Sequence, residues 1–229
     1  MDLPVYEITE QFLTAGGFTW SRALLPEQNK SVLLLSAAHR NQVRDGYFRQ
    51  AWQNHQNFQN LKAIPPAAFY KDDGGEQLLA LEDPVGINLA VAQRQKRLAV
   101  QDILQIAFQL LDVLEHLHQQ NTIAGPLHPA WFSYDLKSKT IQCWQSGLWQ
   151  TPAVCQQEFI NFDDLQSTWL EPAYIAPEHS GLSPFACCPA SDYFCLGSLL
   201  FELLTGKPAF QGSSMTELID SLLDHEPPG

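Results

Sequence analysis

The segment from Asp192 to Leu204 constrains the fold more than any other part of the sequence, because it is apolar on almost every side. A helix with this pattern must be surrounded by other parts of the chain. Ser191 or Asp192 would serve as its N-cap, and Gly206 followed by Pro208 would end it. We therefore expect a central helix that is buried on all sides and carries the rest of a helical domain around it.

The size and charge of the chain exclude several classes of protein. Its 229 residues can form one large domain or two small lobes. The net charge of −12 gives an acidic surface, which repels nucleic acid and anionic lipid. Apolar runs stay well short of the roughly 18 residues of a membrane span, and residues 1–10 do not resemble a signal peptide. We expect a cytoplasmic protein that binds neither nucleic acid nor membranes.

The cysteines indicate a reducing compartment. They are five in number and scattered, with no pair at CxxC spacing. The neighbours Cys187 and Cys188 could be redox-active, but no basic residue nearby would lower a thiol pKa, so an inert loop pair is favoured. Because the histidines do not cluster with the thiols at ligand spacing, the sequence predicts no metal site.

The first part of the chain has the pattern of short strands with one helix between them. Alternating or β-rich runs predict strands at residues 5–8, 18–25, 31–35, 67–71 and 77–82. Residues 72–75 would form the turn of a hairpin. The loosely spaced apolar residues of 41–58 predict a helix.

The second part is helical. Residues 101–118 form a strongly amphipathic pattern, and a capping box at 214–217 begins a final helix that runs to Leu223. The strand pattern gives way to the helix pattern at residues 82–86. We expect a first domain at residues 1–84 and a second at 85–229.

Three segments of the second part resemble the protein kinases. FQLLDVLEHLHQQ at 108–120 is similar to the helix that leads into the catalytic loop, AYIAPEHSG at 173–181 to the A-P-E segment, and residues 191–210 to the helix and loop that follow. The chain looks like the bacterial serine/threonine kinase domains at the N-termini of multidomain signalling proteins. The resemblance implies an α+β, two-lobed protein-kinase-like fold. It would have a small antiparallel β lobe with one helix and a larger helical lobe without its last helices.

The resemblance also assigns structural roles. It implies that Asp192 accepts hydrogen bonds from catalytic-loop amides and that Glu178 pairs with an arginine from a late loop. No arginine follows Glu178, so we expect that the protein continues beyond residue 229 or that a partner covers this surface. The full structural signature is Pro129, Gly147, Ala176, Pro177, Glu178, Asp192 and Gly197.

The catalytic positions that the resemblance implies carry residues unsuited to the reaction. Phosphoryl transfer requires held phosphates, divalent metal and an oriented hydroxyl. A neutral amide such as Gln145 is a poor substitute for a carboxylate at magnesium. The altered positions are Leu35 and Ala51 for the Lys–Glu pair, Ala124, Pro126, His128 and Trp131 in the catalytic loop, and Gln145 in the metal-binding motif. The sequence therefore predicts a pseudokinase that is not an enzyme and acts as a regulatory or protein-interaction module in bacterial signalling.

Alternatives remain open from the sequence. The chain could be a nucleotide-binding or weakly active serine/threonine kinase domain that uses ATP, with weak nucleotide contacts from Gly16, Gly17 and Glu82. No cofactor is predicted, although ATP could bind without magnesium. Asp163 and Asp164 could chelate a metal, but an exposed acidic loop is favoured. Expected partners are another protein or further domains of the same polypeptide. Three tryptophans could line a ligand pocket, although filling of a core is favoured: Trp131, Trp144 and Trp149.

Overall fold

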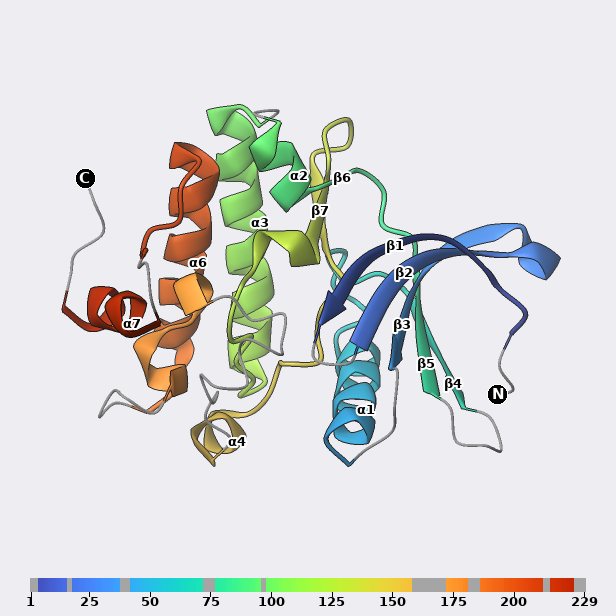
Figure 1. The fold of residues 1–229 in the computed structure, drawn as a ribbon, viewed down its shortest axis with the longest axis horizontal. Helices are drawn as coiled ribbons and strands as arrows, with labels where there is room; N and C mark the ends of the chain where they lie inside the picture. The colour runs from blue at the N-terminus through green and yellow to red at the C-terminus, as the bar shows by residue number, and fades with distance from the viewer. Residues whose placement is uncertain are drawn as a thin grey trace. The chain divides into compact units, whose positions relative to one another are not determined.

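The computed structural model describes residues 4–15, 18–37, 42–71, 77–95, 98–157, 172–180, 186–211 and 215–224. The fold is α+β, with an antiparallel sheet in the first part and several helices in the second (Figure 1). The chain forms two compact units. The first comprises residues up to Val85 together with Gln142–Leu148, and the second comprises most of the remainder.

The first unit is built on a five-stranded antiparallel sheet. Its strands lie in the order β1-β2-β3-β5-β4, and helix α1, Gln42–Asn57, follows β3 in the chain. The predictions for residues 18–25, 67–71 and 77–82 are confirmed with the same bounds. The strand bounds are β1 Glu7–Ala15, β2 Phe18–Leu25, β3 Lys30–Ala37, β4 Ala67–Lys71 and β5 Gln77–Glu82.

The prediction of a first strand at 5–8 was wrong in its bounds. The strand β1 begins at Glu7 and continues to Ala15. Residues 7–11 are exposed, so their polar pattern does not indicate a strand. Pairing with β2, from Glu7 opposite Leu24 to Ala15 opposite Phe18, makes this edge of the sheet.

Both faces of the sheet are covered by apolar side chains, which explains the continuous apolar run of β3. Leu35 lies opposite Trp20 on β2 and Leu79 on β5, and all three are buried. Helix α1 packs on the sheet through Phe48, whose ring centroid lies 6.5 Å from that of Phe69 (Figure 1). The opposite face forms a separate cluster of Ala23, Leu25, Val32, Leu34, Leu78 and Ala80, with Tyr6 and Tyr70 against it.

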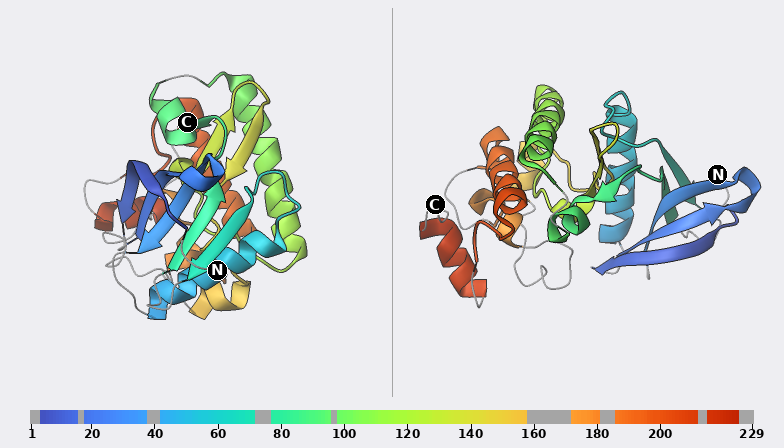
Figure 2. Two further views of the ribbon diagram at one scale, coloured as in Figure 1. Left: turned by 90° about the vertical axis from the view of Figure 1, so that its right-hand side faces the viewer. Right: turned by 90° about the horizontal axis from the view of Figure 1, so that it is seen from above.

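The second unit is mainly helical. Helices α3 and α6 lie side by side at its centre (Figure 1; Figure 2). Its helices are α2 Leu89–Arg94, α3 Val100–Gln119, α4 Pro152–Gln157, α6 Pro189–Thr205 and α7 Met215–Asp224. The short strands β6 Ile87–Asn88, β7 Phe132–Asp135 and β8 Thr140–Cys143 form a three-stranded sheet in that order, and the last two residues of β8 belong to the first unit. Among the helices described, none is long and apolar enough to span a membrane.

Two predictions for α6 were wrong. The helix begins at Pro189 with Cys188 as its N-cap, rather than at Ser191 or Asp192, because the fixed φ of proline suits the first turn of a helix. It is also not buried on all sides, since Tyr193 is 49% exposed. The predicted stop is confirmed: Gly206 has φ 79° and donates its N–H to the Glu202 carbonyl.

Candidate functional site

Asp192, in the first turn of α6, is the centre of the buried polar network in the second unit. Its carboxylate is fully buried and accepts hydrogen bonds from the backbone N–H groups of Ala124 and Gly125, each at 2.8 Å. His118, near the end of α3, lies with Nε2 2.8 Å from Asp192 Oδ2. Gly125 has φ 74°, a conformation that glycine adopts without strain. These amide contacts are the ones that the resemblance to the kinases implies for this aspartate.

Side-chain contacts hold the C-terminal half of the segment 124–131. His128 Nδ1 accepts from the Ala130 N–H at 3.0 Å, and the His128 ring lies edge-on to Tyr174 at 4.8 Å. The Ala130 carbonyl in turn accepts from Asn88 Nδ2 at 2.7 Å. Pro126, Pro129 and Trp131 are buried in the same segment, so its backbone is fixed on both sides of His128.

The A-P-E segment lies beside α6. Ala176 is buried, and the Tyr174 hydroxyl donates a hydrogen bond to the Glu202 carboxylate on α6. The Glu178 Oε2 atom is also buried, and it has no hydrogen-bond partner within the described part of the chain. Pro177 begins the short 3₁₀ turn Pro177–Ser180. Gly197 lies within α6, and a Cβ added there would stand in open space.

The segment Gln145–Gly147 belongs to the first unit and packs on α1. Asn54 Nδ2 donates to the Ser146 carbonyl at 2.6 Å, and Ser146 Oγ donates to the Ala51 carbonyl at 3.4 Å. The buried Gln145 side chain accepts from the Gly147 N–H at 2.7 Å. A Cβ atom at Gly147 would overlap the Tyr47 ring, so any other residue here requires that ring to move.

The positions assigned to the Lys–Glu pair are packed with apolar groups. Leu35 is fully buried and Ala51 is 2% exposed. The neighbouring Trp20 contacts Trp144 edge-on, with ring centroids 4.9 Å apart. In the second unit Trp131 and Trp149 are buried as well, which agrees with the favoured role of these tryptophans as core residues.

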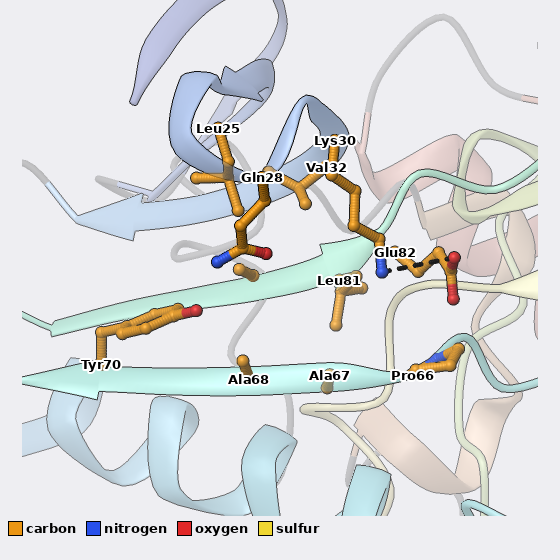
Figure 3. A pocket seen from close by; sticks show the side chains of 11 residues that line it. Leu25, Gln28, Lys30, Val32, Pro66, Ala67, Ala68, Tyr70, Leu81 and Glu82 are labelled. Atoms are coloured by element: carbon orange, nitrogen blue, oxygen red, sulfur yellow. Dashed lines mark ion pairs between the residues drawn. The ribbon is translucent and has the colours of Figure 1, made fainter. Parts of the chain in front are cut away.

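The nucleotide positions named from the sequence lie apart from these networks or outside the described residues. Four of the residues named from the sequence lie outside the described residues: Gly16, Gly17, Asp163 and Asp164. Glu82 is exposed and forms an ion pair with Lys30 at 3.3 Å. Figure 3 shows this pair beside a pocket on the strands β3, β4 and β5, which is lined also by Leu25, Gln28, Val32 and Tyr70.

A second buried carboxylate was missed by the sequence analysis. Asp102 on α3 accepts from Lys139 Nζ at 2.7 Å and from the Tyr134 hydroxyl at 3.1 Å. The hydrogen bond from Lys139 lowers the pKa of Asp102 below its ordinary value, whereas burial and the Asp102 charge raise the pKa of Tyr134 to about 12. Asp102 is more than 30 residues from both of its partners in sequence, and the network ties the strand β7 to α3.

The sequence shows no histidine at ligand spacing from the thiols, but the fold brings one of them beside two cysteines. The fold brings together Cys155 of α4, His179 of the Pro177–Ser180 turn and Cys187, which precedes α6. One potential ligand atom of each lies within 4.8 Å of the others, and all three residues are buried. No sequence motif with fixed spacing connects them, so only the tertiary structure reveals the cluster.

Comparison with known proteins gives relatives among the protein kinases, although no family model matches. The human serine/threonine-protein kinase Sgk2 is 28% identical over 59% of this chain and 34% of its own length. The Arabidopsis thaliana serine/threonine-protein kinase RUNKEL is 30% identical over 66% of this chain and 11% of its own. The mouse ribosomal protein S6 kinase-like 1 is 34% identical over 48% of this chain and 18% of its own.

These relatives correct one prediction. They are named as protein kinases, and nothing in the comparisons shows that catalytic residues have been lost, so the expectation of a protein that is not an enzyme is contradicted. The chain spans about a third or less of the length of each of these relatives. At modest identity, the comparisons support a protein-kinase-like fold for this chain, with serine/threonine protein kinases as its relatives.

Proposed function

We propose that the chain is a protein-kinase-like domain with a regulatory role in signalling, which it exerts by contact with a protein partner or with further domains of the same polypeptide. The observation that supports the kinase-like part is the buried Asp192 carboxylate with the amides of Ala124 and Gly125. The first unit and the second unit would be the two lobes of such a domain. A place in bacterial signalling and in the cytoplasm stays a prediction.

An exposed apolar row on α3 supports the contact with a partner. Its residues are separated by three or four positions and therefore lie on one face of the helix. Each has a large apolar side chain of which at least 39% is exposed. The row consists of Val100, Leu104, Phe108 and Leu111. Adjacent exposed apolar side chains of this kind mark contact surfaces on proteins.

Cysteine labelling tests this contact directly. In a Phe108→Cys variant, a maleimide reagent should label residue 108 quickly in the purified chain and much more slowly in the source cells, because the partner covers the row. A Gln119→Cys variant is the control, since Gln119 is exposed on α3 about two turns beyond Leu111, the last residue of the row. Equal slowing at both positions, or no slowing at residue 108, would contradict a contact at this face.

Nucleotide binding with phosphoryl transfer from ATP to a serine or threonine hydroxyl is the second candidate, and the names of the relatives favour it. A nucleotide that binds only the folded state stabilises it by about 2.7 kcal/mol at one hundred times its dissociation constant. For a domain of this size, that corresponds to a rise in melting temperature of roughly 5–10 °C.

Thermal unfolding with ATP or ADP, each with and without magnesium, separates these possibilities. A magnesium-dependent rise, followed by transfer of labelled phosphate to a protein substrate, would establish the second candidate. A rise that does not depend on magnesium would indicate nucleotide sensing. No rise at millimolar nucleotide would reject nucleotide binding and leave the partner contact as the function to pursue.

A further inference from the structure

The cluster of Cys155, His179 and Cys187 is the strongest candidate for an additional site, and it is separate from the proposed function. Its members come from α4, from the Pro177–Ser180 turn and from the segment before α6. They are 3%, 2% and 2% exposed, respectively. Three chemically reactive side chains are thus enclosed in the interior of the second unit.

His179 gives the second, independent indication of a ligand. Both of its ring nitrogens are buried, and neither has a hydrogen-bond partner among the described residues. A buried polar group without a partner costs free energy, and most buried polar groups in proteins therefore have one. Gly125 leaves space beside this ring, because even a Cβ added there would lie 3.9 Å from Nε2. The imidazole needs a partner that the described residues do not supply.

A metal ion supplies that partner and uses the two thiols as well. Zinc binds thiolate at about 2.3 Å and imidazole at about 2.0 Å, so its tetrahedral ligand atoms lie on the order of 3.5 Å from one another. The three ligand atoms here all lie within 4.8 Å of one another. A small shift of the three side chains toward one another would bring these atoms to the separations that zinc requires. Two thiolates would also neutralise the dication, so that a nearly neutral complex is buried.

A disulfide between the two cysteines explains less of the geometry. The Sγ atoms of Cys155 and Cys187 lie within 4.8 Å of each other, so the two thiols are close. Their oxidation would leave both nitrogens of His179 without a partner. A metal ion accounts for all three side chains together, and ligand sets of two cysteines and one histidine suit zinc.

We propose that Cys155, His179 and Cys187 bind one zinc ion, with a water molecule at the fourth position. The ion joins α4, the Pro177–Ser180 turn and the segment before α6. Binding releases the thiol protons and stabilises the second unit, because the site forms only in the folded chain.

Metal analysis of the chain purified under reducing conditions tests the proposal, and cobalt substitution identifies the ligands. The expected result is one zinc per chain. The cobalt form should show intense ligand-field bands of a tetrahedral site together with thiolate-to-cobalt charge-transfer absorption. Because this readout uses the unaltered chain, it does not depend on the folding of any variant.

Variants then assign the ligands. His179→Gln, Cys155→Ser and Cys187→Ser should each raise the zinc dissociation constant by about 10-fold or more. Cys143→Ala should leave it unchanged, since this buried cysteine belongs to the first unit. The proposal is overturned if the reduced chain holds no stoichiometric zinc, if the cobalt form lacks thiolate absorption, or if mass spectrometry finds Cys155 and Cys187 joined as a disulfide.

Discussion

Replacement of Asp192 by asparagine is the most informative perturbation of the second unit. The side chain keeps its size, but one carboxylate oxygen becomes an NH₂ donor and the negative charge is lost. The Ala124 N–H and His118 lie at Oδ2, while the Gly125 N–H lies at Oδ1. In either orientation of the amide, one backbone N–H faces another donor and loses its acceptor.

The expected loss of stability follows from these three contacts. A hydrogen bond to a charged group contributes about 1.5–3 kcal/mol, and a buried N–H left without an acceptor costs about 1–3 kcal/mol. Disruption of a buried charged network typically costs about 3–5 kcal/mol. We therefore expect Asp192→Asn to lower the free energy of unfolding of the second unit by about 3–5 kcal/mol.

Urea denaturation followed by circular dichroism measures this change. Asp112→Asn makes the same chemical substitution at an exposed position of α3 and should change the stability by less than about 0.5 kcal/mol. If Asp192→Asn also cost less than about 1 kcal/mol, its hydrogen bonds would not fix the segment 124–131 and the reasoning would be refuted.

Three further predictions concern His55 and two glycines. Burial lowers the pKa of His55 from 6.5 to about 4. As the pH falls, the unfolded state therefore binds a proton at this histidine before the folded state does. The free energy of unfolding should fall by about 3 kcal/mol between pH 6.5 and pH 4. In pH-dependent urea titrations, His55→Leu should abolish this loss. Gly147→Ala should lower the urea midpoint by the equivalent of about 1–3 kcal/mol, because its Cβ overlaps the Tyr47 ring; an unchanged midpoint would show that the ring moves freely. Gly197→Ala should instead raise the free energy of unfolding by up to about 1 kcal/mol, and with it the urea midpoint, because a Cβ at this position in α6 meets open space. A lower midpoint would contradict that packing.

The local parts of the fold could be predicted from the sequence because their patterns are local. The β-rich run of β2, the hairpin pattern of β4 and β5 and the amphipathic pattern of α3 predict elements close to those observed. The edge strand β1 has few apolar residues, and its pairing with β2 decides its length. Ser191 and Asp192 are better N-cap residues than Cys188, so the sequence pattern predicts a start of α6 later than the one that Pro189 makes. Helix α2 and the strands β6 to β8 are too short to leave a clear period.

The candidate site could be predicted only in part. Asp192 was found because its motif is contiguous and resembles that of a known family. The cluster of Cys155, His179 and Cys187 and the contact of Asp102 with Lys139 join residues distant in sequence, so no spacing rule finds them. The prediction about enzymatic activity rested on single residues at the positions that the resemblance implies, and the named relatives contradict it.

Amide hydrogen exchange at Ala124 and Gly125, read by NMR, tests the central claim most directly. Both N–H groups are buried and bonded to Asp192, so they should exchange only through unfolding of the second unit, as slowly as the amides at the centre of α6. In Asp192→Asn at least one of them should exchange much faster. Rapid exchange of both amides in the unaltered chain would contradict a kinase-like domain organised around Asp192.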